Sequence, residues 1–141
     1  MKTKFYVCPI CGNVITKLVD SGVTPVCCGA PMREMIPHGQ SEETTEKHVP
    51  VVHREDECTL RVDVGSLPHP MTQGHHISFI WLETEHGAQL QYIFHKPEAT
   101  AEFCGCKDRP VAVYEYCNVH GLWSTDDIPE QKTRSCCCAS K

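Results

Sequence analysis

The chain has 141 residues, a formal net charge of −5 and 40% hydrophobic residues. This length suits one ordinary domain, or a small metal-stabilised module followed by one modest domain. The acidic balance excludes the basic surface that nucleic-acid binding requires and the polybasic segments that hold proteins on anionic membranes. The start of the sequence contains no apolar signal-peptide core, and no apolar run reaches a transmembrane length. We therefore expect a cytoplasmic protein.

Eleven cysteines are a high number for this length. In a secreted small protein they would indicate a disulfide framework. In a reducing compartment, clustered cysteines are more often metal ligands or redox-active thiols. The cysteine content therefore favours metal binding over structural disulfides.

Residues 1–32 predict a small unit built around two cysteine pairs. A short strand over residues 5–7 leads into Cys8-Pro9-Ile10-Cys11-Gly12, in which two cysteines three residues apart can wrap one ion. A second strand over residues 14–18 and a turn over residues 20–22 lead to Cys27-Cys28-Gly29. So few apolar residues cannot form an independent core, and we expect a bound metal to hold this unit together.

Four cysteine sulfurs in tetrahedral geometry suit either zinc or iron. The adjacent pair Cys27 and Cys28 departs from the two spaced knuckles of a zinc ribbon. This spacing is similar to that of the rubredoxin-like iron site of desulforedoxin, which favours an FeCys4 centre. A structural zinc ribbon is the alternative interpretation.

Residues 33–47 carry no hydrophobic period and predict a linker. We place the first domain at residues 1–37, a second at residues 38–126 and a cysteine-rich tail at residues 127–141. The tail contains three consecutive cysteines near its end: Cys136, Cys137 and Cys138. It is interpreted either as a solvated extension or as a redox or partner-binding appendage.

The second domain has the pattern of an all-β antiparallel sandwich. Short segments of alternating polarity cover residues 58–64, 77–82, 89–94 and 111–117, and Gly, Pro and Asp turns separate them. The alternation in the first segment predicts that Leu60 and its neighbours two residues apart share one face. In the third segment it predicts that Leu90, Tyr92 and Phe94 share one face. We expect no helix here.

The strongest candidate site lies near Cys117-Asn118-Val119-His120, where a thiol and an imidazole three residues apart can turn toward one ion. Three upstream histidines can point to the same place: His48, His69 and His75. His69 is clamped between two prolines, so it loses little further entropy on binding a metal. His76 competes with His75, because neighbouring strand residues face opposite sides.

Four neutral imidazoles and one thiolate form a five-coordinate site with one position open for chemistry. We interpret the remaining histidines as structural or exposed: His38, His53, His86 and His95. Cys58, Cys104 and Cys106 stay unassigned. The motif Cys104-Gly105-Cys106 is either a dithiol or a buried, inert pair.

These motifs together resemble those of the desulfoferrodoxin family of two-iron superoxide reductases. The resemblance covers roughly residues 4–124. It rests on the cysteine set Cys8, Cys11, Cys27 and Cys28, on Glu46-Lys47-His48-Val49-Pro50, on Gly65-Ser66-Leu67-Pro68-His69-Pro70-Met71 with His75, and on Cys117-Asn118-Val119-His120-Gly121-Leu122-Trp123.

The resemblance implies two irons per chain: an N-terminal FeCys4 centre and an Fe(His)4Cys centre on an immunoglobulin-like sandwich. Cys117 would be the axial ligand of the second centre, with four equatorial histidines: His48, His69, His75 and His120. The implied reaction is the one-electron reduction of superoxide to hydrogen peroxide, with electrons from a rubredoxin-like donor. Lys47 would attract the anion, and Glu46 would occupy the sixth position in the oxidised state.

The family also implies a cytoplasmic homodimer. Two alternatives from other functional classes remain open at this stage. One is a non-catalytic iron electron-transfer protein with closed centres, and the other is a zinc-stabilised binding module.

Overall fold

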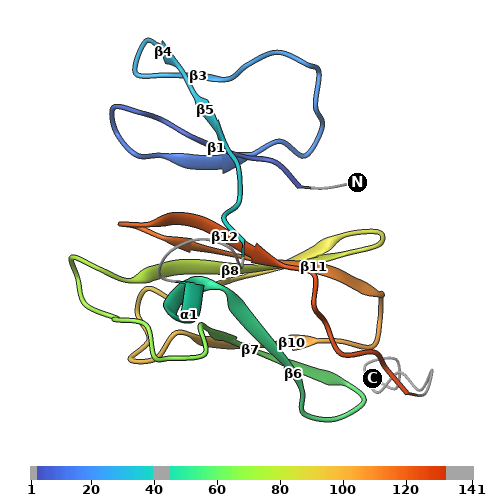
Figure 1. Cartoon of the computed structure of the whole chain (residues 1–141). Helices are drawn as coiled ribbons and strands as arrows, with labels where there is room; N and C mark the ends of the chain where they lie inside the picture. The colour runs from blue at the N-terminus through green and yellow to red at the C-terminus, as the bar shows by residue number, and fades with distance from the viewer. Residues whose placement is uncertain (1–2, 40–44, 133–141) are drawn as a thin grey trace. The chain divides into compact units, whose positions relative to one another are not determined.

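The computed structural model describes residues 3–39 and 45–132 (Figure 1). The chain divides into two compact units, Met1–Ile36 and Pro37–Lys141. The predicted all-β class is confirmed, because nearly all regular structure in both units is strand.

The N-terminal unit contains five short strands. Strand β1 (Phe5–Val7) lies between β2 (Val14–Thr16) and β5 (Arg33–Met35) in an antiparallel sheet, and β3 (Val26–Cys27) pairs with β4 (Ala30–Pro31). Its buried cluster is very small and consists of Tyr6, Cys8 and Met32, with Cys27 packed against them. Two of these four side chains are candidate metal ligands, so the unit depends on its cysteines for a core.

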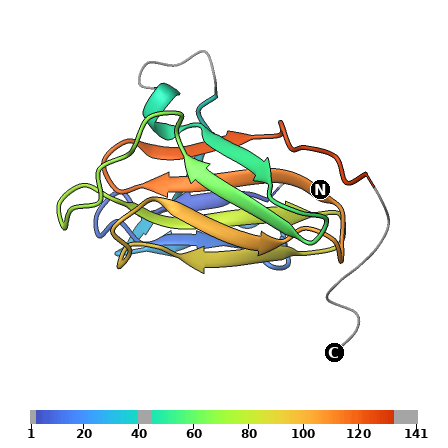
Figure 2. The same cartoon turned by 90° about the horizontal axis from the view of Figure 1, so that it is seen from below.

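The second unit is a sandwich of two antiparallel sheets (Figure 1). One sheet has the order β10-β7-β6 and the other has the order β12-β11-β8-β9. The strands are β6 (Pro50–Arg54), β7 (Thr59–Val64), β8 (Ile77–Thr84), β9 (Ala88–Tyr92), β10 (Thr100–Cys104), β11 (Pro110–Cys117) and β12 (Gly121–Thr125). Figure 2 shows the strands of the three-stranded sheet crossing those of the four-stranded sheet at an angle, as twisted sheets do when they pack face to face.

The core between the sheets follows the predicted alternation of β7. Leu60, Val62 and Val64 are buried against residues from β8 and β11, including Ile80, Leu82 and Val113. The residues of β7 that the sequence places on one face therefore form part of the core between the two sheets.

The alternation predicted for β9 is confirmed, because Leu90, Tyr92 and Phe94 share one face. Leu90, Tyr92 and Phe94 are exposed, by 40%, 61% and 59%. The alternate residues, Gln89 and Gln91, turn toward β10 instead. Their side-chain amides donate to the carbonyls of Cys104 and Glu102, and the Gln89 oxygen accepts from the Cys104 N–H. These hydrogen bonds satisfy backbone groups of β10, so the polar face of β9 turns toward β10 and the apolar face stays exposed.

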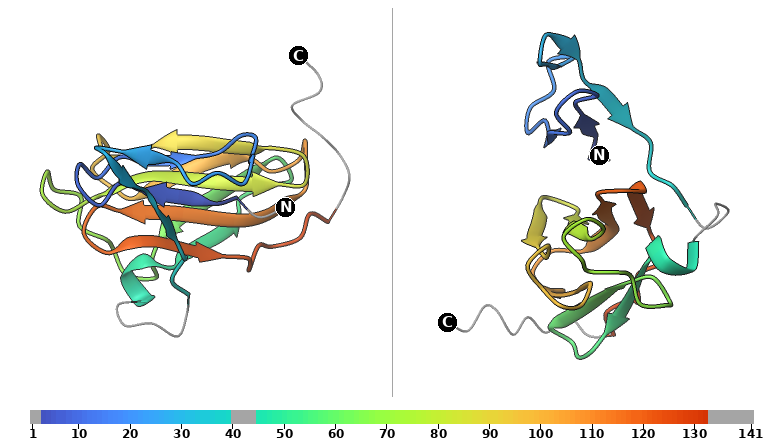
Figure 3. Two further views of the ribbon diagram at one scale, coloured as in Figure 1. Left: turned by 90° about the horizontal axis from the view of Figure 1, so that it is seen from above. Right: turned by 90° about the vertical axis from the view of Figure 1, so that its left-hand side faces the viewer.

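One helical turn, α1 (Thr45–His48), precedes β6. The expectation of no helix was wrong at this point, because a helix of four residues is too short to show a hydrophobic period. The right-hand view of Figure 3 shows α1 and the β7–β8 loop at the same end of the sandwich, both toward the viewer. Among the described residues, no helix is long and apolar enough to cross a membrane.

Candidate metal centres

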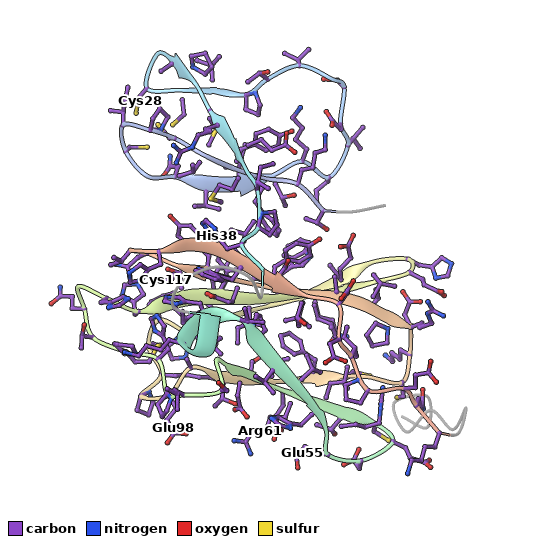
Figure 4. The ribbon with its side chains drawn as sticks, viewed as in Figure 1. Cys28, His38, Glu55, Arg61, Glu98 and Cys117 are labelled. Carbon is purple, nitrogen blue, oxygen red and sulfur yellow. The ribbon has the colours of Figure 1, made fainter. Side chains whose placement is uncertain are left out.

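Five side chains from three segments converge at this end of the sandwich. His48 ends α1, His69 and His75 lie in the β7–β8 loop, and Cys117 and His120 flank the tight β11–β12 turn. One nitrogen or sulfur atom from each lies within 4.8 Å of the corresponding atoms of the others. Figure 4 shows Cys117 beside α1.

The four imidazoles stand around a common point. Neighbouring rings meet edge to face in the order His48, His69, His75, His120 and back to His48, with centroid separations of 4.7, 4.8, 5.0 and 4.6 Å and interplanar angles of 60–81°. This cyclic order is the one that four equatorial ligands of a single ion adopt. Cys117 is fully buried beneath the group, while His120 is exposed.

The donor atoms are those that a metal requires. The Nε2 atoms of His48 and His69 face each other at 3.1 Å, close to the roughly 3.0 Å expected of adjacent nitrogens about 2.1 Å from one ion. The Nδ1 atom of His69 lies 2.6 Å from the Pro70 carbonyl oxygen. Donation of its hydrogen there leaves Nε2 unprotonated.

The remaining donors support the same interpretation. The Nε2 atom of His75 is buried and has no hydrogen-bond partner within the described part of the chain. His120 turns its Nδ1 atom toward Cys117 Sγ, at 3.7 Å, and its backbone N–H donates to the same sulfur at 3.3 Å. An orphaned, buried ring nitrogen is costly unless an ion binds it.

Burial favours the neutral imidazoles of His69 and His75 by lowering the pKa of each. Desolvation lowers the pKa of His69 to about 4, against the opposing effect of its bond to Pro70. Desolvation and the nearby His120 also lower the pKa of His75. Neutral imidazole is the form that binds metal, so the site is prepared for ligation near neutral pH.

The pKa of the Cys117 thiol shifts in the opposite direction. Burial raises its pKa, although the backbone N–H of His120 acts against this shift. A buried thiol becomes a thiolate when a cation binds it. The donor set of four imidazoles and one thiolate therefore fits a redox-active transition metal such as iron.

Two residues outside the predicted ligand set hold this site in place. The Trp123 ring stacks on His48 at 4.8 Å, and its Nε1–H donates to the His120 carbonyl oxygen. Asn118 hydrogen bonds with Gly74 and His76 on either side of His75. Their places inside the Cys117–Trp123 motif were the only sequence signal for these roles.

The two predicted substrate residues lie on α1. Lys47 is exposed and directly precedes His48, and its charge contributes to lowering the pKa of His75. The side chain of Glu46 lies outside the described residues.

The other histidines lie outside the cluster. His53 contacts Asp63 at 3.3 Å, and His86 contacts Asp108 at 2.9 Å. The His76 ring hydrogen bonds with the Thr72 carbonyl oxygen instead of turning to the centre. His38 is exposed, but its backbone pairs with β12 and its ring lies 4.8 Å from Trp123.

A second donor cluster lies in the N-terminal unit, where Cys8, Cys11, Cys27 and Cys28 bring their sulfurs within 4.8 Å of one another. Cys11 Sγ lies 3.6 Å from Cys27 Sγ, and Cys27 Sγ lies 3.9 Å from Cys28 Sγ. A tetrahedral site with metal–sulfur bonds of about 2.3 Å has sulfur–sulfur edges of about 3.8 Å. The separations therefore match one metal ion held by four thiolates.

Positive backbone φ angles allow the adjacent cysteines to share this site. Cys28 has φ 53° and Gly29 has φ 73°, so the chain folds back behind the sulfurs. A non-glycine residue in this conformation is uncommon and is costly without a compensating interaction.

The thiols of this cluster oppose one another's ionisation. Backbone N–H groups, first that of Cys11, lower the pKa of Cys8 to about 6. Cys11, Cys27 and Cys8, in that order, raise the pKa of Cys28 to about 12. All four become thiolates together only when a cation balances their charge.

The chain is similar to known proteins along most of its length. Residues 40–126 match the family model described as Desulfoferrodoxin, and residues 1–35 match the one described as Desulfoferrodoxin, N-terminal domain. A desulfoferrodoxin from Syntrophotalea carbinolica is 37% identical over 127 residues, which cover 89% of this chain and 97% of that protein. One from Nitratidesulfovibrio vulgaris is 37% identical over 123 residues, with coverage of 87% and 95%.

A solved structure is also similar. The superoxide reductase from Treponema pallidum superposes with a TM-score of 0.73 at 27% sequence identity, covering 88% of this chain and 98% of that one. Both family models, the relatives that match along nearly their whole length and the two donor clusters agree. The chain belongs to the desulfoferrodoxin family.

Proposed function

We propose that this chain is a superoxide reductase, which converts superoxide, one electron and two protons into hydrogen peroxide. The observation that carries the proposal is the convergence of four imidazoles and one thiol on one point. Membership of the desulfoferrodoxin family and similarity to a solved superoxide reductase support it.

Each donor cluster is proposed to bind one iron, which gives two per chain. When bound at the histidine–cysteine site, iron supplies the electron that superoxide takes up. The described residues offer five donors there, and a six-coordinate ion therefore keeps one position for the substrate.

The protein residues tune this chemistry. Cys117 is proposed to hold the metal through its sulfur, and its thiolate would supply electron density there. The four histidines would hold the ion as neutral donors, without adding negative charge that would repel superoxide. The hydrogen bond from the His120 N–H to Cys117 Sγ holds the thiolate in place and moderates its basicity.

Lys47 is proposed to attract superoxide. The chain is acidic overall, so a local positive charge beside the site is needed to steer an anion inward. Lys47 is exposed and precedes the ligand His48. Glu46 is proposed, from the family resemblance, to fill the sixth position in the oxidised state and to leave when substrate or reductant arrives.

The remaining expectations follow from the same resemblance. The FeCys4 centre is a candidate for electron transfer, and a rubredoxin-like protein is the proposed donor. We also propose a cytoplasmic homodimer. Sedimentation of the iron-loaded chain tests the dimer, and reduction by purified rubredoxin tests the donor.

Metal analysis with visible spectroscopy tests the proposed function. We expect two irons per chain and a coloured protein whose ferric histidine–cysteine centre changes its spectrum when azide is added. A colourless zinc protein would support the binding-module alternative. An iron protein whose spectrum ignores azide and cyanide would be a closed electron carrier.

A further inference from the structure

Two cysteine thiols lie at the end of the sandwich opposite the histidine–cysteine site and take no part in the proposed reaction. Cys104 ends β10, and Cys106 follows it in the loop before β11. Strand β11 runs eight residues from this loop to Cys117, which corresponds to about 23 Å. These thiols are therefore too far from the histidine–cysteine site to bind the same metal.

The two sulfurs face each other. Cys104 Sγ and Cys106 Sγ are 3.7 Å apart, and both residues are half-buried. The residue between them is glycine for a steric reason, because a Cβ at Gly105 would lie 2.7 Å from Leu60 Cγ and 3.2 Å from Arg54 Nη1. The absence of that side chain lets the two cysteines lie close together over a tightly packed backbone.

Hydrogen bonds from two other segments fix the backbone of this pair. The Gln89 side chain donates to the Cys104 carbonyl oxygen at 2.8 Å and accepts from the Cys104 N–H at 3.2 Å. The Gly105 N–H donates to the Cys58 carbonyl oxygen at 2.7 Å. Because the backbone is held on both sides, the two thiols need little further ordering before a bond forms between their sulfurs.

A cavity of about 860 Å³ gives a small solute access to the pair from solvent, and its lining includes Cys106, Arg54 and Arg109. Arg54 Nη1 is buried beside Gly105 and has no hydrogen-bond partner in the part of the chain that the structure describes. An N–H group in this position can donate to an oxygen that gains negative charge during a reaction at the neighbouring sulfur. The site therefore combines a reachable thiol with a donor for a leaving oxygen.

Hydrogen peroxide is the oxidant that suits this site. It is small and uncharged, and it oxidises accessible thiols to sulfenic acids, which condense with a second thiol to a disulfide. The other cysteine thiols that the structure describes belong to the two donor clusters. The proposed reduction of superoxide releases hydrogen peroxide, so the inference rests on the proposed function for its source of oxidant.

We propose that Cys104 and Cys106 form a dithiol that reduces hydrogen peroxide to water. The Cys106 sulfur attacks one peroxide oxygen, the O–O bond breaks, and the other oxygen takes the thiol proton and leaves as water. The Cys104 sulfur then attacks the resulting Cys106 sulfenic acid, an S–S bond forms, and the hydroxyl group leaves with the second thiol proton as another water.

The two sulfurs together give up two electrons in this reaction, and the two peroxide oxygens take them up. The product is a disulfide between residues only two positions apart. Such a small ring is strained, and strained disulfides are easily reduced. A small dithiol reductant therefore restores the pair for another cycle.

Peptide mapping of the ferric, iron-loaded full chain tests the proposal with hydrogen peroxide added as a reagent. The chain is first treated with dithiothreitol and desalted, then exposed to peroxide, and its remaining thiols are blocked by alkylation. Trypsin releases residues 62–107, whose only cysteines are Cys104 and Cys106, because Lys96 precedes a proline. We expect a doubly alkylated peptide before peroxide, an unlabelled, internally bridged peptide after it, and the first form again after dithiothreitol.

Two single variants test the order of the steps. In Cys104→Ser, the sulfenic acid on Cys106 has no second thiol to condense with, so dimedone should label peptide 62–107 once. In Cys106→Ser, the attacking thiol is lost and the label should be absent. The visible spectrum of the distant iron centre reports whether each variant has folded, and the mapping of the unmodified chain depends on neither variant.

A synthetic peptide of residues 98–110 is the matched control, because it contains the same two thiols without the fold. The pair should close at least about tenfold faster in the chain than in this peptide, since the fold orients the sulfurs and supplies Arg54. Equal rates would mean adventitious oxidation and would overturn the proposal. So would a peptide 62–107 that stays doubly alkylated, one joined to another peptide, or dimedone labelling of Cys106→Ser alone. Because peroxide is added directly, a failure of the superoxide reaction would leave these results unchanged.

Discussion

The side chain of Asn118 fixes the backbone on both sides of His75. Its Nδ2 donates to the Gly74 carbonyl oxygen at 3.0 Å, and its Oδ1 accepts from the His76 N–H at 2.8 Å. Asn118 follows directly after Cys117, so one residue ties the β7–β8 loop to the strand that carries the thiol. The relative positions of two proposed ligands therefore depend on one amide.

Asn118→Ala should weaken iron binding at the histidine–cysteine site by about 10–100-fold, because the loop that carries His75 loses both hydrogen bonds. Competition with a chelator, followed in the visible spectrum, measures this affinity. Asn118→Asp is the matched control, since it keeps the acceptor for His76 and loses the donor to Gly74. The iron affinity of Asn118→Asp should lie between those of Asn118→Ala and the unmodified chain. An unchanged affinity in both variants would contradict the positioning role.

Lys47→Ala should slow the second-order reaction with superoxide by about tenfold, because the local positive charge that attracts the anion is lost. The iron spectrum should stay the same, since Lys47 is not a ligand. Stopped-flow mixing or pulse radiolysis measures the rate. Lys107→Ala, an exposed lysine at the other end of the sandwich, provides the control.

The salt dependence of the superoxide rate provides a second test of Lys47→Ala. Added salt should slow the unmodified chain more than Lys47→Ala, because screening acts on the charge that the variant lacks. Equal rates and equal salt slopes in both proteins would exclude steering by Lys47.

Cys28→Ser should remove the metal of the N-terminal unit. This unit has a buried cluster of very few residues, so loss of the metal should also unfold it. The sandwich has its own core and should keep its iron and its reaction with superoxide. Iron analysis, circular dichroism and the superoxide rate together check this expectation. A loss of the sandwich iron in the same variant would show that the two centres are not independent.

The His86–Asp108 pair should make stability depend on pH. Hydrogen bonding to Asp108 raises the pKa of His86, and the same contact lowers the pKa of Asp108 to about 2. The contribution from His86 is complete below its unfolded pKa of about 6.5 and is lost as pH rises through the raised value. The contribution from Asp108 is present above about pH 3.8 and is lost as pH falls toward 2.

Asp108→Asn isolates this effect, because the amide oxygen can still accept from the His86 backbone N–H. The variant should be less stable than the unmodified chain at about pH 5 and nearly equal to it at about pH 9. Denaturant midpoints at both pH values measure the difference. If the stability difference between the variant and the unmodified chain is the same at both pH values, the ion pair contributes nothing to stability.

The ligand set was predictable from the sequence because its motifs carry their own local geometry. Cys117 and His120 flank one tight turn, and Pro68 and Pro70 fix the backbone around His69. These short-range constraints are visible in the order of residues. That all five donors would meet depended on the family resemblance, since no local rule brings α1 to the β11–β12 turn.

The parts that the sequence did not predict depend on long-range partners. Gln89 and Gln91 face β10, which follows them in the chain, because its carbonyl oxygens accept hydrogen bonds from their side-chain amides. The alternation of β9 predicted that Leu90, Tyr92 and Phe94 share one face, but it did not predict that this face is exposed. The Gly105 N–H likewise donates to the Cys58 carbonyl oxygen because β7 and β10 pair in antiparallel register.

The most direct test of the central claim is the stoichiometry of the reaction of the iron-loaded chain with superoxide. If the five-donor site reduces superoxide, each superoxide consumed should yield one hydrogen peroxide and no dioxygen in the presence of excess reductant. Cys117→Ser should abolish this reaction together with the thiolate-to-iron charge-transfer band. Evolution of one dioxygen for every two superoxides would show dismutation and contradict the account, as would a Cys117→Ser variant that keeps both the band and the reaction.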